Sequence, residues 1–385
     1  MKIKIVTPFI GKFKDKGGGQ DRVVYELFLY LHNHGWQVTI LTQKIDEDFF
    51  QKYKNNITRI PYFKSFPQIF NEIIHMFYFT FATYDSPQAL HLHGDNAFIR
   101  HHINTCHFCH SAWLRFLPNI EEPIFKKFYH FGYSFLHSIL EHIILKRLAK
   151  TVVAVSEKVK KELVNYVGIP ENKIKVIYNG VDTQIFHPHF KKRKEEDYLK
   201  TLYPYKKGDF ILLFAGDMSR GVKGVDTILK MAEILDNPNI VILLAGSKKG
   251  NIFLKKLKTM KNSRIFFLGY RKDLDSIMRN ADVFVFPTRY EPCSVVILEA
   301  MASGLPVITS KPEINGAAEL IKNGINGFIL KDNTDPYELK EIVLNLLKNP
   351  SMKMRIGKNA RKTALKYTWE NMAKKYEKLY MEILR

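Results

Sequence analysis

Residues 290–310 read YEPCSVVILEAMASGLPVITS, and this stretch decides the fold. Ser294 is a residue type that caps helices, and the apolar residues after it predict a helix over 295–303 that ends at Gly304. An apolar strand, 282–286, precedes the stretch, and another begins at its proline. A strand, a loop, a helix and a second strand in this order predict a unit of parallel α/β structure.

The same alternation extends outward through the rest of the chain. An amphipathic helix is predicted over Gln20–His34, and Gly35 is suited to end it. The fold class is therefore α/β, with two doubly wound domains. The predicted strands are Ile3–Thr7, Gln37–Leu41, Ala89–His93, Thr151–Val155, Phe210–Ala215, Ile240–Ala245, Arg264–Leu268, Asp282–Phe286 and Pro306–Thr309.

The chain has 385 residues, which is long for one core and suits two. A polar, proline-containing and charged segment near 188–208 predicts a linker. We expect one domain over 1–190 and a second over 191–367. The last segment, 368–385, carries an apolar stripe at helical spacing that needs a surface on either domain.

Composition limits the partners and the compartment. The 59 Lys and Arg against 38 Asp and Glu give a net charge of +21, which favours polyanions such as nucleic acid or an anionic lipid surface. A solvated, lysine-rich surface is the alternative. No zinc finger, RNP-like strand or basic zipper is present, so nucleic acid is not expected as a partner. Three scattered cysteines, no signal peptide and no spanning segment predict a cytoplasmic protein.

Two glutamates stand eight positions apart in the opening stretch. Glu291 is expected in the loop beyond a strand's carboxyl end, and Glu299 in the second turn of the helix. Ligands of α/β sheets bind in this place, and the amides of a helix start attract phosphate oxygens. Glu299 could hold a ribose and Glu291 a second sugar, because a carboxylate accepts hydrogen bonds from vicinal hydroxyls. The alternative is a pair of solvated or capping carboxylates.

The E-x7-E string within EPCSVVILEAMASGLPVI resembles the signature of the family 4 retaining glycosyltransferases. Further resemblances follow in the family's order: GGGQDRVVYEL at 17–27, AVSEKVKKEL at 154–163, VIYNGVDTQIFHP at 176–188 and FAGDMSRGVKGVDTIL at 214–229. Within the family, the chain looks most like the bacterial lipopolysaccharide core glucosyltransferases. The resemblance implies a GT-B fold, with two Rossmann-like domains facing an interdomain cleft and the C-terminal helix crossing back to the first domain.

The resemblance also implies roles for individual residues. Arg220 and Lys223 would clamp the donor diphosphate, although Asp217 stands where many members carry an arginine. His107 would point toward the transferred sugar, with a merely packed histidine as the alternative. The catalytic set is thus Glu291, His107, Arg220 and Lys223, and the donor-binding set adds Gly17, Gly18, Gly19, Tyr270, Arg271, Cys293, Ser294, Val295, Val296 and Glu299.

No metal and no cofactor is expected. The pair Cys106 and Cys109, with His107 and His110, could suggest zinc, but a structural site needs four ligands and no second cysteine pair exists. The D-x-D strings at 46–48 and 273–275 fall in turn or helix-start contexts. The family generally uses a basic diphosphate clamp in place of a divalent ion.

The expected partners are a nucleotide-sugar donor, such as UDP-glucose or another UDP-sugar, and a cell-envelope glycan or lipid-linked acceptor. Residues 123–150 combine aromatic and basic residues, and residues 66–81 are rich in aromatic ones, which suits helices on an anionic bilayer at the inner face of the cytoplasmic membrane. Core helices of the first domain are the alternative. Rival functions are a nucleotide-sugar epimerase of the same fold, a nucleic-acid binder, and a phosphorylase, for which no pyridoxal lysine is evident.

Overall fold

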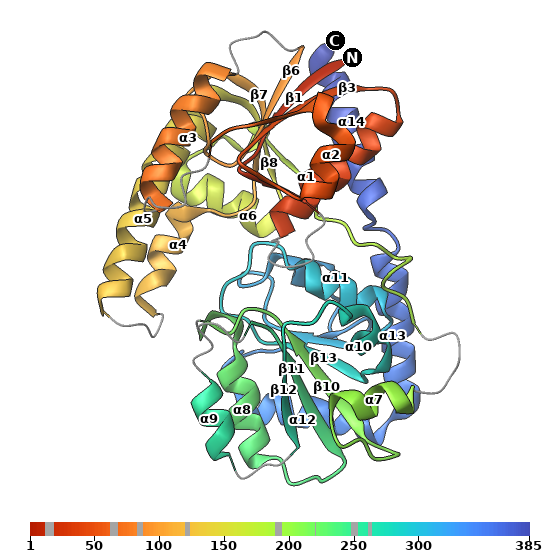
Figure 1. Cartoon of the computed structure of the whole chain (residues 1–385). Coiled ribbons are helices and arrows are strands. Elements are labelled where there is room, and N and C mark those ends of the chain that lie inside the picture. The colour runs from red at the N-terminus through yellow and green to blue at the C-terminus, as the bar shows by residue number, and fades with distance from the viewer. Residues whose placement is uncertain are drawn as a thin grey trace. The chain divides into compact units, whose positions relative to one another are not determined.

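The structure is a computed structural model that describes residues 1–11, 19–61, 68–82, 88–119, 124–188, 195–219, 221–247, 253–260 and 264–385. The chain packs as two units (Figure 1). Unit 1 holds the described residues up to Gly180 together with Trp369–Arg385, and unit 2 holds Val181–Thr368. The chain passes from unit 1 to unit 2 ten residues before the predicted position, and the C-terminal helix belongs to unit 1.

Unit 1 is built on a seven-stranded parallel sheet in the order β5-β3-β1-β6-β7-β8-β9. Its strands are β1 (Lys2–Val6), β3 (Gln37–Thr42), β5 (Ile57–Arg59), β6 (Ala89–His93), β7 (His101–Cys106), β8 (Ala149–Ala154) and β9 (Ile174–Val176), and a small sheet pairs β2 (Phe9–Ile10) with β4 (Lys44–Ile45). Its helices are α1 (Gly19–Asn33), α2 (Glu47–Tyr53), α3 (Gln68–Ala82), α4 (His110–Phe116), α5 (Ile124–Ile143), α6 (Glu157–Glu162) and α14 (Trp369–Leu384). Figure 1 shows α3 and α5 on one side of the sheet and α1, α2 and α14 on the other.

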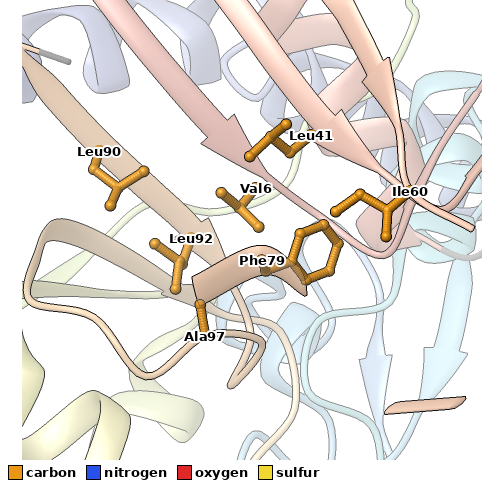
Figure 2. Close-up of a cluster of buried hydrophobic side chains, with 7 residues drawn as sticks. All are labelled: Val6, Leu41, Ile60, Phe79, Leu90, Leu92 and Ala97. Carbon is orange, nitrogen blue, oxygen red and sulfur yellow. The ribbon is translucent and has the colours of Figure 1, made fainter. Parts of the chain in front are cut away.

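Helices cover the apolar faces of this sheet. Phe79 of α3 packs on side chains of β1, β3 and β6 in one buried cluster (Figure 2). On the opposite side, α14 packs against α1. Glu377 of α14 accepts hydrogen bonds from the Tyr30 hydroxyl at 2.8 Å and from Trp36 Nε1 at 2.9 Å. The C-terminal helix is therefore fixed to unit 1 by polar contacts as well as by its apolar stripe.

Unit 2 is built on a six-stranded parallel sheet in the order β12-β11-β10-β13-β14-β15. Its strands are β10 (Phe210–Ala215), β11 (Ile240–Ala245), β12 (Ile265–Gly269), β13 (Val283–Phe286), β14 (Val307–Thr309) and β15 (Phe328–Ile329). Its helices are α7 (Glu196–Leu202), α8 (Val225–Ile234), α9 (Leu254–Thr259), α10 (Leu274–Asn280), α11 (Val295–Ala302), α12 (Pro336–Lys348) and α13 (Pro350–Ala364). Helix α8 packs against α12, and α11 against α13.

The α/β class and the parallel sheets agree with the sequence. Strands β6, β10 and β11 have the predicted bounds, and each is buried along its whole length. The helix of the opening stretch covers Val295–Ala302, one residue shorter than predicted, and Gly304 follows it at φ +77°. The positive φ explains why glycine stands at this position.

Candidate active site

The candidate donor site lies at the point where the strand order of unit 2 reverses. From β10 the chain adds β11 and β12 on one side, and then β13, β14 and β15 on the other. Strands β10 and β13 are therefore parallel neighbours, and the loops after them leave the same edge of the sheet. Such a switch point is where ligands of open α/β sheets bind.

Two predicted site residues meet at this switch point. Lys223 comes from the loop between β10 and α8, and Glu291 from the loop between β13 and α11. Lys223 Nζ forms an ion pair with Glu291 Oε2, and both side chains are mostly buried, at 23% and 17% exposure. The loop backbone at Glu291 is held as well, since Glu291 N donates to the Ile314 carbonyl at 2.9 Å and its own carbonyl accepts from Gly316 N at 3.0 Å.

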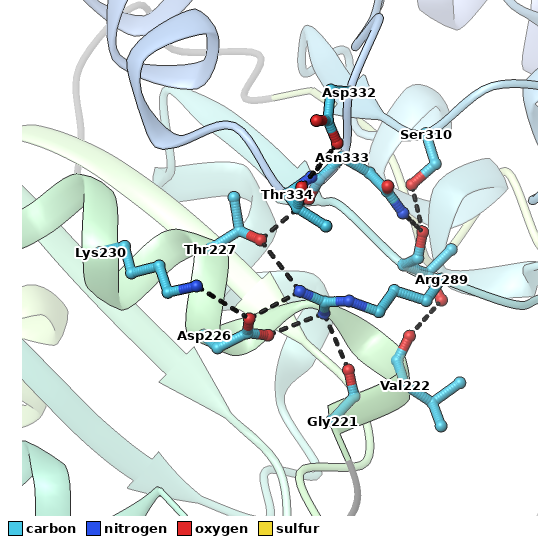
Figure 3. A network of polar contacts seen from close by, with 11 residues as sticks. Gly221, Val222, Asp226, Thr227, Lys230, Arg289, Ser310, Asp332, Asn333 and Thr334 are labelled. Atoms are coloured by element: carbon cyan, nitrogen blue, oxygen red, sulfur yellow. Dashed lines mark hydrogen bonds and ion pairs between the residues drawn. The ribbon is translucent and has the colours of Figure 1, made fainter. Parts of the chain in front are cut away.

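A polar network fastens the two loops to each other (Figure 3). Arg289 donates to both carboxylate oxygens of Asp226, at 2.7 and 2.6 Å, and to the Gly221 carbonyl at 2.9 Å. Its backbone N–H donates to the Val222 carbonyl at 2.7 Å. Gly224 completes the contact, because a Cβ there would lie 1.9 Å from the Pro287 carbonyl oxygen. Lys223 is thus placed by the fixed backbone on either side of it.

Helix α11 presents one partly accessible face beside this pair. Val295, Val296 and Glu299 are half-buried, whereas Cys293 and Ser294 are buried. The prediction that Ser294 is the cap residue at the start of the helix is confirmed. Ser294 occupies the N-cap position in extended conformation, but its side chain makes no capping hydrogen bond. The spacing of Glu299 from Val295 and Val296 puts all three on one side of the helix.

The predicted donor-binding residues Tyr270 and Arg271 follow β12. Tyr270 is exposed there. Arg271 donates to both oxygens of Asp273, at 2.9 and 2.6 Å, and the Tyr198 hydroxyl donates to Asp273 at 2.7 Å. The hydrogen bonds that Arg271 donates to Asp273 raise the pKa of Arg271. The Arg271 guanidinium is therefore engaged by its own chain.

Three predicted residues, Gly17, Gly18 and Arg220, lie outside the described residues. Gly19 is the first residue of α1. The two D-x-D strings have structural roles: Asp46 caps α2 by accepting from Asp48 N and Phe49 N, and Asp275 pairs with Arg279. Within the described residues, no group of three His, Cys, Asp or Glu side chains could hold a metal ion. Cys106 and Cys109 are buried, and Cys106 Sγ donates to the Phe108 carbonyl at 3.2 Å.

Unit 1 has a pocket of about 200 Å³ at its own switch point, between β1 and β6. Segments after β1, β3, β6 and β7 line it, as do parts of α1, α3 and α5. The lining residues are Pro8, Phe9, Gln20, Gln43, Met76, Phe79, His93, Gly94, Asp95, Asn96, His107, Phe108, His110, Tyr133 and His137. The predicted residue His107 therefore borders a cavity.

Imidazoles and one carboxylate supply the titratable groups of this pocket. His93 Nδ1 and His107 Nε2 lie 2.9 Å apart and share a hydrogen bond. His137 Nδ1 pairs with Asp95 Oδ2 at 2.7 Å. Burial lowers the pKa of His107 to about 3 and that of His93 well below its usual value, so both rings are neutral at physiological pH.

The balance of charge distinguishes the two sites. No lysine or arginine is among the described residues that line the pocket of unit 1. Burial opposes ionisation of Asp95, but His137, His110 and a backbone hydrogen bond together outweigh it and lower the pKa of that carboxyl. The pocket offers neutral donors, aromatic rings and a carboxylate, which suit hydroxyl groups better than phosphate.

The sequence had indicated only part of this pocket. The sequence singles out His107 and His110 beside the pair Cys106 and Cys109, but Tyr133 and His137 come from α5, far along the chain. No local pattern marks a pairing over 42 residues such as His137 with Asp95. An alternation of polar residues with aromatic ones in α5 was the available signal.

Two protein-family models match the chain, one to each half. The model described as Glycosyltransferase Family 4 matches residues 17–185, and the model described as Glycosyl transferases group 1 matches residues 200–363. Both halves of the chain thus match glycosyltransferase models in the order that the sequence motifs indicate.

Curated relatives agree with these matches. An uncharacterized glycosyltransferase of Methanocaldococcus jannaschii is 31% identical over 60% of this chain and 59% of its own. The N,N'-diacetylbacillosaminyl-diphospho-undecaprenol alpha-1,3-N-acetylgalactosaminyltransferase of Campylobacter jejuni is 31% identical over 58% of each chain. The chain thus spans less than two thirds of the length of these relatives.

Solved structures share the fold over almost the whole chain. Sucrose-phosphate synthase from Thermosynechococcus elongatus has a TM-score of 0.78 and 19% identity, covering 99% of this chain and 98% of its own. WaaG, a glycosyltransferase of lipopolysaccharide biosynthesis, has a TM-score of 0.76 and 17% identity, covering 97% of this chain and 98% of its own. Anabaena HepE in complex with UDP-glucose has a TM-score of 0.72 and 16% identity, covering 98% of this chain and 99% of its own. These likenesses show the GT-B fold.

Proposed function

The chain belongs to the family 4 glycosyltransferases of GT-B fold, and we propose that it transfers a hexose from a nucleotide sugar to an acceptor of cell-envelope glycan synthesis. The observation that carries the proposal is the Lys223–Glu291 pair beside α11 at the switch point of unit 2. A cation, a carboxylate and a helix start in one place match the diphosphate, the hydroxyls and the anionic oxygens of a sugar nucleotide.

Each group has a role in the proposed transfer. Lys223, together with Arg220, stabilises the negative charge that develops on the departing diphosphate. Glu291 accepts hydrogen bonds from hydroxyls of the transferred hexose, and Glu299 from the ribose. We propose retention of configuration by front-face attack, with a leaving phosphate oxygen taking the acceptor's proton and no metal ion required.

The donor is proposed to be UDP-glucose or a related UDP-sugar. The solved structure of HepE holds UDP-glucose in the same fold, which supports the choice. Thermal-shift measurements with UDP-, GDP- and ADP-sugars test it, and the UDP compounds should raise Tm most. Glu299→Ala should abolish that rise, whereas Glu341→Ala, an exposed carboxylate on α12, should keep it. An unchanged shift in Glu299→Ala contradicts the nucleotide placement.

The acceptor is proposed to be a glycan or a lipid-linked sugar. The relative from Campylobacter jejuni carries diphospho-undecaprenol in its name, which supports a lipid carrier. Incubation with a UDP-[14C]sugar and a diphospho-undecaprenol-linked sugar should move label into the lipid phase. An epimerase would instead convert the donor without any acceptor, so chromatography of the nucleotide sugar distinguishes the two activities.

We also propose that α5 rests on an anionic membrane surface at the inner face of the cytoplasmic membrane. This helix buries three polar side chains, Ser134, His137 and Glu141, together with Leu140, and it exposes aromatic and aliphatic side chains. The exposed set is Ile124, Phe125, Phe128, Tyr129, Phe131, Phe135 and Ile139. Lys126 and Lys127 lie beside them, which adds attraction to anionic lipid.

This surface can be tested without activity. None of the described helices is long and apolar enough to cross a bilayer. Vesicles rich in phosphatidylglycerol should sediment the protein at low salt. The variant Phe128→Ser, at a side chain 72% exposed, should weaken sedimentation, while Met354→Ser, at one 68% exposed in unit 2, should not. Equal sedimentation of both variants contradicts the role of α5.

A further inference from the structure

His93 is a buried histidine with one nitrogen unexplained. Its Nδ1 shares the hydrogen bond with His107 Nε2, but its Nε2 is buried and has no hydrogen-bond partner within the described residues. Most buried polar groups of proteins are paired, so an orphan of this kind needs a physical account. His93 itself is completely buried.

The orphan nitrogen decides where the proton of His93 lies. A buried N–H without an acceptor is rarer than an acceptor without a donor. The favoured tautomer of His93 therefore leaves Nε2 bare and carries the proton on Nδ1. That proton is then donated to His107 Nε2, which must be the unprotonated nitrogen of a neutral ring.

The neighbouring ring of His91, which is itself held by hydrogen bonds, fixes the position of His93. The ring of His91 lies 4.3 Å from that of His93, between centroids. Both nitrogens of His91 have partners, the Tyr380 hydroxyl at 2.6 Å and Thr105 Oγ1 at 2.8 Å, and Thr105 also contacts the Tyr376 hydroxyl at 3.0 Å. The two tyrosines belong to α14, so the C-terminal helix supports the histidines of β6.

From this geometry we infer that His93 is a positioning residue, which holds His107 in the tautomer with its proton on Nδ1. Within the described residues Nδ1 of His107 has no hydrogen-bond partner, and it is not a buried orphan atom. Because Nε2 faces His93, Nδ1 is the nitrogen that a pocket ligand can use. His107 thereby offers a neutral N–H donor, suited to an uncharged oxygen such as a sugar hydroxyl or ring oxygen.

This inference rests on the proposed function for its ligand, but its first test does not. In a long-range ¹H–¹⁵N correlation spectrum of the full chain labelled with [¹⁵N]histidine, His107 should show a protonated Nδ1 and a bare Nε2. The signals are assigned by their loss in His107→Gln. A protonated Nε2 on His107 in the unaltered chain overturns the inference, whatever reaction the protein performs.

Variants of His93 provide the second test. His93→Phe keeps the ring but removes the donor, and should release His107 to the other tautomer and lower kcat/KM for transfer by about tenfold, the worth of one hydrogen bond. His93→Asn keeps an amide N–H near the place of Nδ1, and should restore both the Nδ1–H signal and most of the activity. His34→Phe, at an exposed ring, is the control. Loss of activity in both His93 variants with the His107 signals unchanged would show a merely structural role.

Discussion

The Lys223–Glu291 pair should stabilise unit 2 as well as serve the donor, and a double-mutant cycle can measure how much. Two unit charges about 4 Å apart attract by about 4 kcal/mol at an effective dielectric constant of 20. Desolvation and lost side-chain freedom offset most of this attraction. Since the side chains are 23% and 17% exposed, the net coupling should lie between surface and buried pairs, at about 1–2 kcal/mol.

The variants are Lys223→Met, Glu291→Gln and their combination. All three tryptophans, Trp36, Trp113 and Trp369, lie in unit 1, so their fluorescence follows that unit. Unfolding by urea is therefore measured by far-UV circular dichroism, in which helices of both units contribute. The unfolding of unit 2 is the transition that appears in circular dichroism but not in tryptophan fluorescence. The coupling energy is calculated from the free energies of that transition in the four proteins.

An exposed pair in the same unit is the control. Lys256 and Glu233 lie 3.2 Å apart at 39% and 47% exposure, so their coupling should stay below about 0.5 kcal/mol. A Lys223–Glu291 coupling equal to that of the control would refute the argument that burial strengthens the pair. Lys223→Met should also weaken UDP binding at least about tenfold, because a charge-assisted hydrogen bond is lost.

Three further predictions concern single sites. Gly224→Ala should lower the free energy of unfolding by about 2–4 kcal/mol, because φ is +72° and the new Cβ would meet the Pro287 carbonyl. The control is Gly221→Ala, whose new Cβ would meet no atom of the described residues within 4 Å, so urea unfolding should be unchanged. Burial raises the pKa of Glu141 from 4.5 to about 7, so the folded protein favours the protonated carboxyl. The free energy of unfolding should therefore be highest below pH 4.5 and should fall by up to about 3 kcal/mol as the pH rises to 7. Glu141→Gln should flatten that decline in tryptophan-detected unfolding between pH 5 and 7.5, and an equal slope in both proteins would contradict it. Glu377→Ala should cost about 2 kcal/mol and alter tryptophan emission, because two hydrogen bonds to a carboxylate are lost.

The sequence predicts the strands best where burial is complete. Strands β10 and β11 are apolar at every position, so their limits are visible as changes in composition. Strands β2, β4 and β15 have two residues each, which is too short for any period to show. The E-x7-E stretch placed Glu291 and Glu299 correctly around α11, because its cap position, helix and terminal glycine are all local features.

The orientation of α5 shows what local sequence does not determine. Its period predicts an amphipathic helix, and the ordinary expectation is that the apolar face is buried. The buried face instead carries three polar side chains beside Leu140, since Glu141 accepts hydrogen bonds from His110 N at 2.5 Å and Ser111 N at 2.9 Å, and His137 pairs with Asp95. The partners of this face lie about 30 to 42 residues away. Buried hydrogen bonds and an ion pair therefore take part, with Leu140, in selecting which side of the helix faces inward.

The degree of burial gives the two units different chemistry at the switch points of their sheets. Each sheet reverses its strand order once among the described strands, and each collects polar side chains beyond that point. In unit 2 the side chains are a lysine and a carboxylate that remain partly accessible, so charge is available to a ligand. In unit 1 burial keeps His93 and His107 neutral, so these two rings can offer directed hydrogen bonds but no charge. A diphosphate is bound best by charged side chains, whereas an uncharged sugar oxygen is bound best by a hydrogen-bond donor with a fixed orientation. We therefore propose that the nucleotide binds to unit 2 and that an uncharged sugar oxygen binds to His107.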